Sequence, residues 1–192
     1  MLRCLDGPPT VTNATTTRRW TYADYCRIPA DRRRHEIVDA RHFVTPSPSP
    51  RHQDVTGRLY VALFTALERT GRGRVFVAPL DVHLAPGTIV QPDLVVLGKR
   101  RRSIVGPKKL TGVPDLLVEI LSPSHRTHDT VRKRERYQRA GVRELWLVDP
   151  DACTVTQLVL RKGRYALVAT ATDTIAARAL RGVRIDLTDV FA

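Results

Sequence analysis

The chain has 192 residues, with 32 lysines and arginines against 19 aspartates and glutamates, and a formal net charge of +13 at pH 7. This length suits one domain with a buried core, and a hydrophobic share of 42% excludes a wholly disordered chain. No apolar run reaches the roughly 20 residues that cross a bilayer, and the N-terminus lacks the apolar core of a signal peptide. We therefore expect a cytoplasmic protein with no membrane segment.

The excess of basic residues predicts a polyanionic partner, most often nucleic acid and less often an anionic lipid surface. Most of these residues are arginine, a skew that genome composition can also produce. Net charge alone therefore leaves the partner open and indicates no particular site.

The three cysteines, Cys4, Cys26 and Cys153, are odd in number and far apart, and no CxxC pair occurs. This pattern favours neither a disulfide framework nor a thiolate zinc site. Lone cysteines are usually small buried hydrophobic residues, so we interpret these three as buried, reduced thiols, as expected in a cytosol.

The N-terminal half of the chain predicts a tail and then the start of a domain. Residues 1–19 are polar and threonine-rich, which indicates a flexible tail ahead of a single domain over residues 20–192. Capping-box spacing, a proline-rich run and apolar residues at three- and four-residue intervals mark the next elements. In chain order we expect a short helix over 21–27, strands over 35–39 and 41–44, an extended loop over 46–50 and an amphipathic helix over 51–70.

The C-terminal half alternates apolar strands with one charged helix. Two continuous apolar runs are typical of buried central strands. The expected elements are strands over 75–77, 81–84, 93–97 and 115–121, a basic loop over 99–109, a helix over 127–140, a strand over 144–149, a hairpin of 153–160 and 164–169, and a short C-terminal strand and helix. This order predicts a mixed α/β (α+β) fold, with flanking helices and an added β-meander and hairpin.

Three acidic residues lie in or beside these apolar strands, where an ionised carboxylate needs a cation nearby. They are Glu36, Asp93 and Glu119, the last of which shares its strand face with Leu117 and Leu121. For any one of them, a salt bridge to an arginine is the more common explanation. Three in one small domain make a shared divalent cation competitive, and carboxylate oxygens favour Mg²⁺ or Mn²⁺ over zinc.

The helix expected next carries Asp129, Lys133 and Tyr137 four residues apart, so the three share one face. The alternative is a solvated basic helix with one ion pair. His125 and His128 allow a transition-metal pair, but no third ligand is spaced for it, and a helix cap at this junction explains the sequence equally well.

Six motifs span most of the chain. They are H-E-I-V-D (35–39), P-S-P followed by His52, Q-P-D-L-V-V-L (91–97), G-V-P-D-L-L-V-E-I-L-S-P-S (112–124), D-x-x-x-K-x-x-x-Y (129–137) and G-V-x-E-L-W-L-V-D-P (141–150). Together they resemble the Uma2 family of bacterial endonucleases, which belongs to the PD-(D/E)XK nuclease superfamily. The resemblance covers about residues 20–192, and the motifs follow the order of the family.

The resemblance implies a restriction-endonuclease-like core, in which metal-binding carboxylates stand on the central strands of a mixed sheet. Carried over by position, Asp93 and Glu119 become the metal ligands, and Glu36 becomes an additional ligand or water-positioning residue. The superfamily lysine normally stands two residues after the second acid. Because Leu121 occupies that position, Lys133 on the following helix becomes its replacement.

Further residues acquire roles through the same resemblance. His52 stands where the family has a histidine near a helix start, and with Asp129 and Tyr137 it is a candidate for a supporting role. Phosphate contacts around the acidic pocket are expected from Arg102, Lys108, Lys109, Arg132 and Arg136.

The sequence thus predicts an Mg²⁺- or Mn²⁺-dependent endonuclease that hydrolyses DNA phosphodiester bonds, and allows a homodimer. Metal ions on Asp93 and Glu119 would activate a water molecule, and Lys133 would stabilise charge on the phosphate. Two alternatives stay open. One is a catalytically inactive nucleic-acid-binding protein on the same fold, and the other is a protein-interaction module whose basic surface binds an acidic protein.

Overall fold

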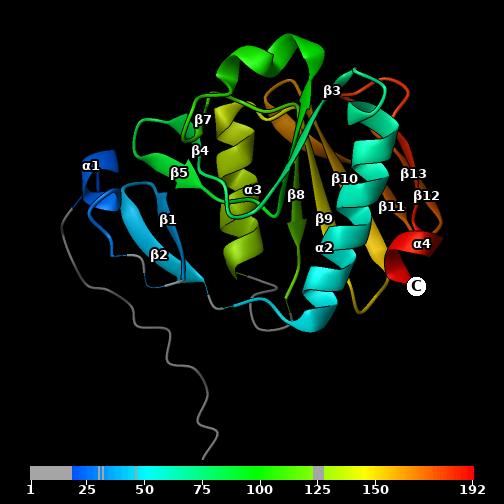
Figure 1. Cartoon of the computed structure of the whole chain (residues 1–192), viewed down its shortest axis with the longest axis horizontal. Helices are drawn as coiled ribbons and strands as arrows, with labels where there is room; N and C mark the ends of the chain where they lie inside the picture. Colours follow the sequence, from blue (N-terminus) through cyan, green and yellow to red (C-terminus); the bar gives the residue numbers. More distant parts are fainter. Residues whose placement is uncertain (1–18, 30, 32, 46, 123–127) are drawn as a thin grey trace, which may run out of the picture.

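The computed structural model describes residues 19–29, 31, 33–45, 47–122 and 128–192 (Figure 1). Of the tail expected over residues 1–19, only Arg19 falls within this part of the chain, so the expectation of flexibility lies outside the described residues. Within the described part, no helix is long and apolar enough to cross a membrane.

Short strands alternate with a few helices. The helical segments are α1 (Tyr22–Tyr25), α2 (Pro50–Leu63) with its π-helical continuation η1 (Phe64–Glu68), the 3-10 helix η2 (Lys99–Ile104), α3 (His128–Ala140) and α4 (Thr188–Phe191). The strands are β1 (Arg34–Val38), β2 (Arg41–Thr45), β3 (Gly73–Val77), β4 (Val82–Ala85), β5 (Thr88–Val90), β6 (Leu94–Gly98), β7 (Leu110–Thr111), β8 (Leu116–Ile120), β9 (Glu144–Asp149), β10 (Thr154–Arg161), β11 (Arg164–Ala171), β12 (Thr174–Ala176) and β13 (Arg184–Asp186).

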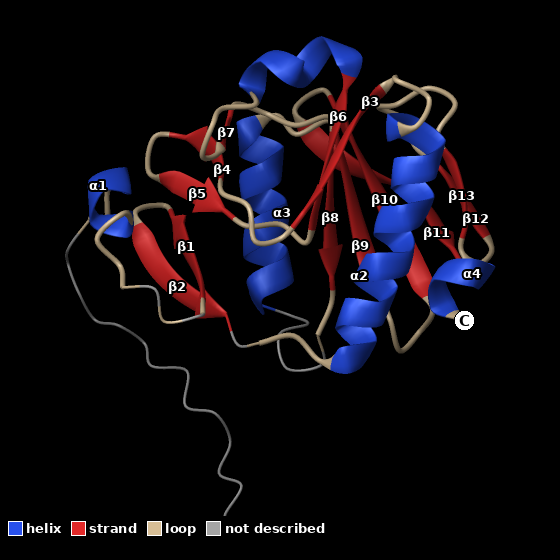
Figure 2. Cartoon of the chain, in the orientation of Figure 1, coloured by secondary structure: helices blue, strands red, loops and turns tan. Residues whose placement is uncertain are grey.

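Two sheets and a two-stranded hairpin organise these strands (Figure 2). The first sheet has five strands in the order β2-β1-β5-β4-β7, and the second has six in the order β11-β10-β9-β8-β6-β3. Within the six-stranded sheet, β8 and β9 pair in parallel, and the other neighbours pair antiparallel. The mixed sheet confirms the expected α/β class.

The six-stranded sheet runs between α2 and α3 (Figure 1). On β8, Leu116, Val118 and Ile120 pack into one core with α2 and α4. Leu117 points to the other face and packs into a second core with Tyr137 of α3 and with the five-stranded sheet. Both faces of β8 are therefore buried, as its continuous apolar run indicated.

Several local predictions are confirmed. The strand over 144–149 has the bounds predicted for it, and α1 carries a capping box in which Thr21 and Asp24 bond each other reciprocally. The helix expected over 51–70 begins one residue earlier, because Ser49 caps it and Pro50 suits its first turn. Gly71 follows it in the left-handed region with a φ of 68°.

Other expectations need correction. The segment expected as a basic loop contains η2, and the short strands β5 and β7 were not predicted, since strands of three and two residues depend on their neighbours for pairing. The interpretation of the cysteines as buried is wrong for the two that are described. Cys26 is exposed and Cys153 is half-buried, and both are free thiols.

Candidate active site

Three carboxylates from distant parts of the chain meet at one end of the six-stranded sheet. Asp93 directly precedes β6, and Glu119 is the fourth residue of β8. Because Leu94 pairs with Val118, the two acids take neighbouring positions across these antiparallel strands. Glu36 approaches from β1 of the five-stranded sheet. All three are buried, with exposed fractions of 2% for Glu36, 3% for Asp93 and 6% for Glu119.

Helix α3 supplies the side chains that contact two of these acids. Lys133 Nζ lies 3.1 Å from Glu119 Oε2 and 3.4 Å from Glu36 Oε2. Tyr137 stands one turn further on the same face, and its hydroxyl donates a hydrogen bond of 2.5 Å to Glu119 Oε1. The structure thus brings Lys133 and Tyr137 to Glu119, as their helical spacing indicated.

The surroundings of Glu119 disfavour its charged form. Burial raises the pKa of Glu119 to about 7, against the pull of the Lys133 charge, which lowers it. The negative charges of Asp93 and Glu36 raise this pKa further, and the Tyr137 hydrogen bond lowers it. The pKa stays raised beside an ammonium group because burial, together with the charges of Asp93 and Glu36, outweighs Lys133 and the Tyr137 hydrogen bond.

The surroundings of Asp93, in contrast, favour its charged form. Arg34 Nη1 donates to Asp93 Oδ1 at 2.7 Å, and His52 Nε2 lies 3.3 Å from the same oxygen. The N–H of Ile120 donates to Asp93 Oδ2 at 2.8 Å. Burial alone would raise the pKa of Asp93, but the contacts with His52, Arg34 and Ile120 outweigh it and lower the pKa to about 2. Asp93 is therefore an anion at neutral pH.

Glu36 is fixed by the segment before β6. The N–H of Gln91 donates to Glu36 Oε1 at 2.7 Å, and the carbonyl of Gln91 accepts a hydrogen bond from Arg34 Nη2. The Gln91 side chain donates to Asp81 Oδ1 at 2.8 Å and to the Tyr25 hydroxyl at 3.0 Å. These bonds join β1, α1 and the start of β6 around the acids.

Unpaired polar atoms gather in the same place. Among the described residues, the buried side-chain nitrogens and oxygens without a hydrogen-bond partner are Arg34 Nε, His52 Nδ1 and Gln91 Oε1. All three belong to residues that contact Asp93 or Glu36. Stable folds rarely leave such atoms unpaired, and catalytic or ligand-binding sites are a common reason when they do.

The three carboxylates are suitable ligands for a divalent cation, although they are not arranged as a complete coordination shell. Asp93, Glu119 and Glu36 offer the oxygen ligands that Mg²⁺ prefers, and these acids outnumber the cations Lys133 and Arg34. In the part of the chain that the structure describes, no three His, Cys, Asp or Glu side chains are grouped as an ion would require. Mg²⁺ often uses one or two carboxylates and takes water and phosphate as its other ligands, so two acids suffice.

The residues expected to contact phosphate occupy different environments. Arg132 is exposed on α3, one residue before Lys133. Arg136 is only 7% exposed, because it packs 5.8 Å over the ring of Phe43 and pairs with Asp39 at 3.3 Å. A buried position of this kind does not suit a phosphate contact.

Arg102 also departs from its expected place. It lies in η2, which follows the C-terminal end of β6, whereas Asp93 directly precedes this strand. At ~3.3 Å per residue, the two ends of β6 are about 17 Å apart. Arg102 therefore lies away from the three acids, and its expected contact with phosphate stays a prediction. Lys109 Nζ lies 3.3 Å from the centre of the Tyr22 ring, and Lys108 beside it is exposed.

The other candidates are placed in part. His52, in the first turn of α2, contacts Asp93 as a supporting role requires. The side chains of His128 and Asp129, and the whole of His125, lie outside the described residues, so their suggested roles stay predictions.

Two residues at the acids were missed at the level of sequence. Arg34 stands two residues before Glu36 on the same strand, so both side chains share a face, and this spacing could have revealed it. Gln91 contacts Glu36 through its backbone N–H, and no side-chain pattern indicates such a contact.

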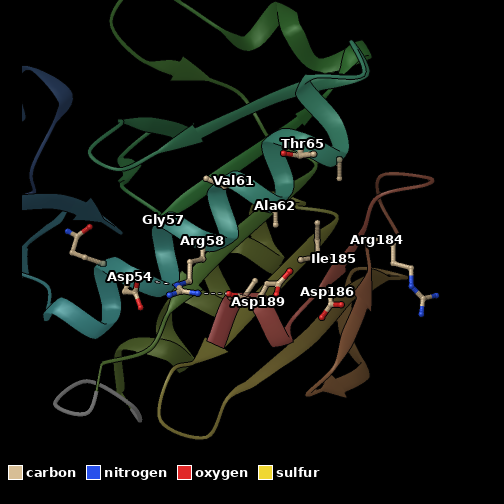
Figure 3. Close-up of a pocket in the computed structure, with 13 residues that line it drawn as sticks. Asp54, Gly57, Arg58, Val61, Ala62, Thr65, Arg184, Ile185, Asp186 and Asp189 are labelled. Carbon is tan, nitrogen blue, oxygen red and sulfur yellow. Dashed lines mark hydrogen bonds and ion pairs between the residues drawn. The ribbon is translucent and has the colours of Figure 1, made fainter. Parts of the chain in front are cut away.

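A separate hollow of about 670 Å³ lies along α2, where this helix faces β13 and α4 (Figure 3). Arg58 crosses part of it, with Nε 3.2 Å from Asp54 Oδ1 and Nη1 donating to the Asp189 carbonyl at 3.0 Å. Val61 and Ala62 also line the hollow. Its lining does not include the three clustered acids, so it is distinct from the candidate site.

Comparisons with known proteins agree with this geometry. A family model named Uma2 and described as "Putative restriction endonuclease" matches residues 22–188. A solved structure of "a putative nuclease belonging to DUF820" from Anabaena variabilis superposes with a TM-score of 0.73, at 17% sequence identity, over 89% of this chain and 97% of that chain. At this identity the second likeness supports the fold alone. None of the curated proteins matches the chain.

Proposed function

The chain belongs to the Uma2 family, and from this premise we propose that it is a metal-dependent endonuclease that hydrolyses DNA phosphodiester bonds. The observation that carries the proposal is the meeting of Asp93 and Glu119 on adjacent strands, with Lys133 3.1 Å from Glu119. Buried acids beside a lysine provide oxygen ligands and a positive charge in one place, which is the combination that phosphodiester hydrolysis requires.

We assign Asp93 and Glu119 as ligands of Mg²⁺ or Mn²⁺, with Glu36 as a further ligand or a residue that positions water. A bound divalent cation would supply Lewis-acid stabilisation of the phosphate and a water of lowered pKa. Its charge would also lower the pKa of Glu119, which burial and the neighbouring acids raise.

The side chains around the acids have distinct tasks in this proposal. Lys133 stabilises negative charge on the non-bridging phosphate oxygens, because its ammonium group lies beside the acids that would hold the metal. Tyr137 fixes the orientation of Glu119, while Arg34 and His52 fix Asp93. In the reaction the water oxygen bonds to phosphorus, the bond to the leaving oxygen breaks, and that oxygen ends with a proton.

The test is cleavage of supercoiled plasmid DNA in the presence of MgCl₂, followed on agarose gels. We expect Glu119→Gln and Asp93→Asn each to lower the cleavage rate by ~10²-fold or more, as removal of a key electrostatic group does in other enzymes. EDTA should abolish cleavage by the unaltered protein. The matched control is Glu135→Gln, which removes an exposed carboxylate from the same helix as Lys133. Full cleavage by both site variants would refute the assignment.

One observation favours a second candidate function, a nucleic-acid-binding protein without catalysis. Lys133 already pairs with both Glu36 and Glu119, so these charges have partners without a metal. This alternative expects the unaltered protein to bind DNA and to leave plasmid intact with Mg²⁺ or Mn²⁺. Calorimetric titration of MnCl₂ into the protein separates the two, because only the nuclease proposal requires a metal site that Asp93→Asn removes.

We further propose that residues 20–192 act as one domain, since both hydrophobic cores use the same six-stranded sheet. A cytoplasmic location and a homodimer stay predictions, and sedimentation equilibrium tests the homodimer directly.

A further inference from the structure

Among the described residues, many exposed arginines and lysines lie at the end of the six-stranded sheet that is away from the acids. Five segments form this end. They are residues 69–74 at the start of β3, 99–102 after β6, Arg143 before β9, the β10–β11 turn over 161–164 and the turn over 178–182. Strand pairing places the first four together, because Gly73 pairs with Gly98 and Leu160 N bonds the carbonyl of Arg143. The turn over 178–182 lies beside them, because Arg72 Nη1 donates to the carbonyl of Arg181 at 3.1 Å. Figure 1 shows η2 and the end of α2 at the same edge of the molecule.

We call this surface the basic end. Its exposed basic residues are Arg69, Arg72, Arg74, Lys99, Arg100, Arg102, Arg143, Arg161, Lys162, Arg164, Arg178 and Arg181. They come from five separate segments of the chain, so only the fold brings them together.

The acids described at this end are already neutralised. Asp115 is 3% exposed and accepts hydrogen bonds from Gly98 N, Arg101 and Arg143. Glu68 pairs with Arg74 at 3.1 Å. Glu144 is fully buried and bonded to neutral donors. Most of the exposed arginines and lysines therefore face solvent without a compensating carboxylate, which produces a strong local positive potential.

The composition of the basic end indicates which polyanion it binds. The large apolar side chains exposed in the described part of the chain are Val44, Val61, Val77, Val105, Val131 and Leu167, so the basic end has neither an exposed aromatic ring nor an apolar cluster. A membrane-binding surface normally inserts apolar side chains, and a tight protein interface has a desolvated apolar or aromatic centre. Dispersed guanidinium and ammonium groups suit the repeated phosphates of a nucleic acid backbone, without reading its bases.

We infer that the basic end is a second nucleic-acid-binding surface, which holds the phosphate backbone of a segment other than the one at the acids. The inference rests on the proposed function only in taking nucleic acid as the substrate class. The two regions lie at opposite ends of β6, about 17 Å apart along the strand. Binding at the basic end therefore adds affinity that is independent of sequence and leaves the acids free for the scissile phosphate.

The test compares two triple variants that remove the same charge. Lys99→Gln, Arg100→Gln and Lys162→Gln alter the basic end, and Arg27→Gln, Arg33→Gln and Arg41→Gln alter exposed arginines elsewhere. Fluorescence anisotropy of a labelled duplex of about 30 base pairs is measured in EDTA over a range of KCl concentrations. We expect the first variant to lose about 10-fold or more in affinity at low salt, and its slope against log[KCl] to fall by about 2 to 3. The control should lose no more than about 3-fold.

Equal losses in the two variants would show that only net charge matters and would overturn the inference. Unchanged duplex binding by the first variant would overturn it as well, including the case in which that variant instead loses binding to phosphatidylglycerol vesicles or polyglutamate. Circular dichroism checks folding, and Arg161→Gln with Arg164→Gln repeats the test if the first variant unfolds. Because EDTA prevents cleavage, failure of the nuclease proposal and failure of this inference give different results.

Discussion

Glu119 and Glu144 stand on neighbouring parallel strands, and both are buried, but their surroundings differ in kind. Glu144 accepts four hydrogen bonds, from Trp146 Nε1 at 2.7 Å, Gln157 Nε2 at 2.6 Å and the N–H groups of Arg178 and Ala179 at 2.8 and 2.6 Å. Glu119 is bonded by Tyr137 and paired with Lys133, and it faces two other acids.

The difference separates a carboxylate that stabilises the fold from one that suits chemistry. Neutral donors satisfy every oxygen of Glu144 and tie β9, β10 and the turn after β12 together. At Glu119 the pKa is raised to about 7, and unpaired polar atoms lie among the residues around the neighbouring acids. A buried carboxylate thus becomes a functional candidate when its charge is poorly compensated, and burial alone is not sufficient.

The largest effect on stability is expected at Glu144. Glu144→Ala leaves two buried side-chain donors and two partly buried N–H groups without this acceptor, and at ~1 kcal/mol or more for each, the free energy of unfolding should fall by about 3 to 5 kcal/mol. Urea unfolding followed by tryptophan fluorescence measures this change. A loss below about 1 kcal/mol would contradict the structural role assigned to Glu144.

Glu119→Gln should stabilise the fold at neutral and higher pH, whereas Glu144→Ala destabilises it. Because the pKa of Glu119 is higher in the folded than in the unfolded chain, folding takes up a proton, and that contribution is present at low pH and lost as the pH rises from about 4.5 to about 7. In EDTA, the free energy of unfolding of the variant should rise relative to that of the unaltered protein between pH 5 and pH 8, by on the order of 2 kcal/mol. At pH 8, Mg²⁺ should raise the Tm of the unaltered protein and not that of the variant. A gain that does not vary with pH would contradict the shifted pKa.

Tyr137→Phe tests the link between α3 and Glu119. Loss of a hydrogen bond to a charged group should lower the free energy of unfolding by about 1 to 2 kcal/mol and, if the nuclease proposal holds, the cleavage rate by roughly 10-fold. Because this hydrogen bond lowers the pKa of Glu119, its removal should move the acidic limb of the pH–rate profile to higher pH. Tyr165→Phe is the control, since Tyr165 is also buried but donates to the Val142 carbonyl, and the pH–rate profile should not move.

The smallest effect is expected at Asp39, which is half exposed and pairs with Arg136 and Arg139 at 3.3 and 3.1 Å. Partial burial raises its pKa, but the two arginines outweigh this and lower it. The ion pairs therefore stabilise the fold above the ordinary pKa of an aspartate, and that stability is lost as the pH falls through the lowered pKa. Asp39→Asn keeps a residue that tolerates the φ of 48° and should cost ~0.5 kcal/mol or less at pH 7, and less still in 1 M KCl. A salt-independent cost would point to packing.

Prediction from sequence succeeded where short-range rules apply. Helical spacing placed Lys133 and Tyr137 on one face, and an acid in an apolar strand identified Glu119. The same rule should have identified Glu144 as a candidate, because it stands at the start of another buried strand. Its donors come from Gln157 and from the turn at Arg178, and no local pattern in the sequence reports that they converge on it.

The sequence by itself determined the mixed α/β class, the main strands and the identity of the clustered acids, because periodicity and burial act over a few residues. Only the tertiary structure decided that Arg34 and His52 hold Asp93 ionised, since these contacts depend on the register of strands far apart in the chain. It also decided that twelve exposed arginines and lysines of the described residues lie together at the basic end, away from the acids. Net charge is a sum over all residues, whereas a binding surface depends on which segments the strand ends bring together.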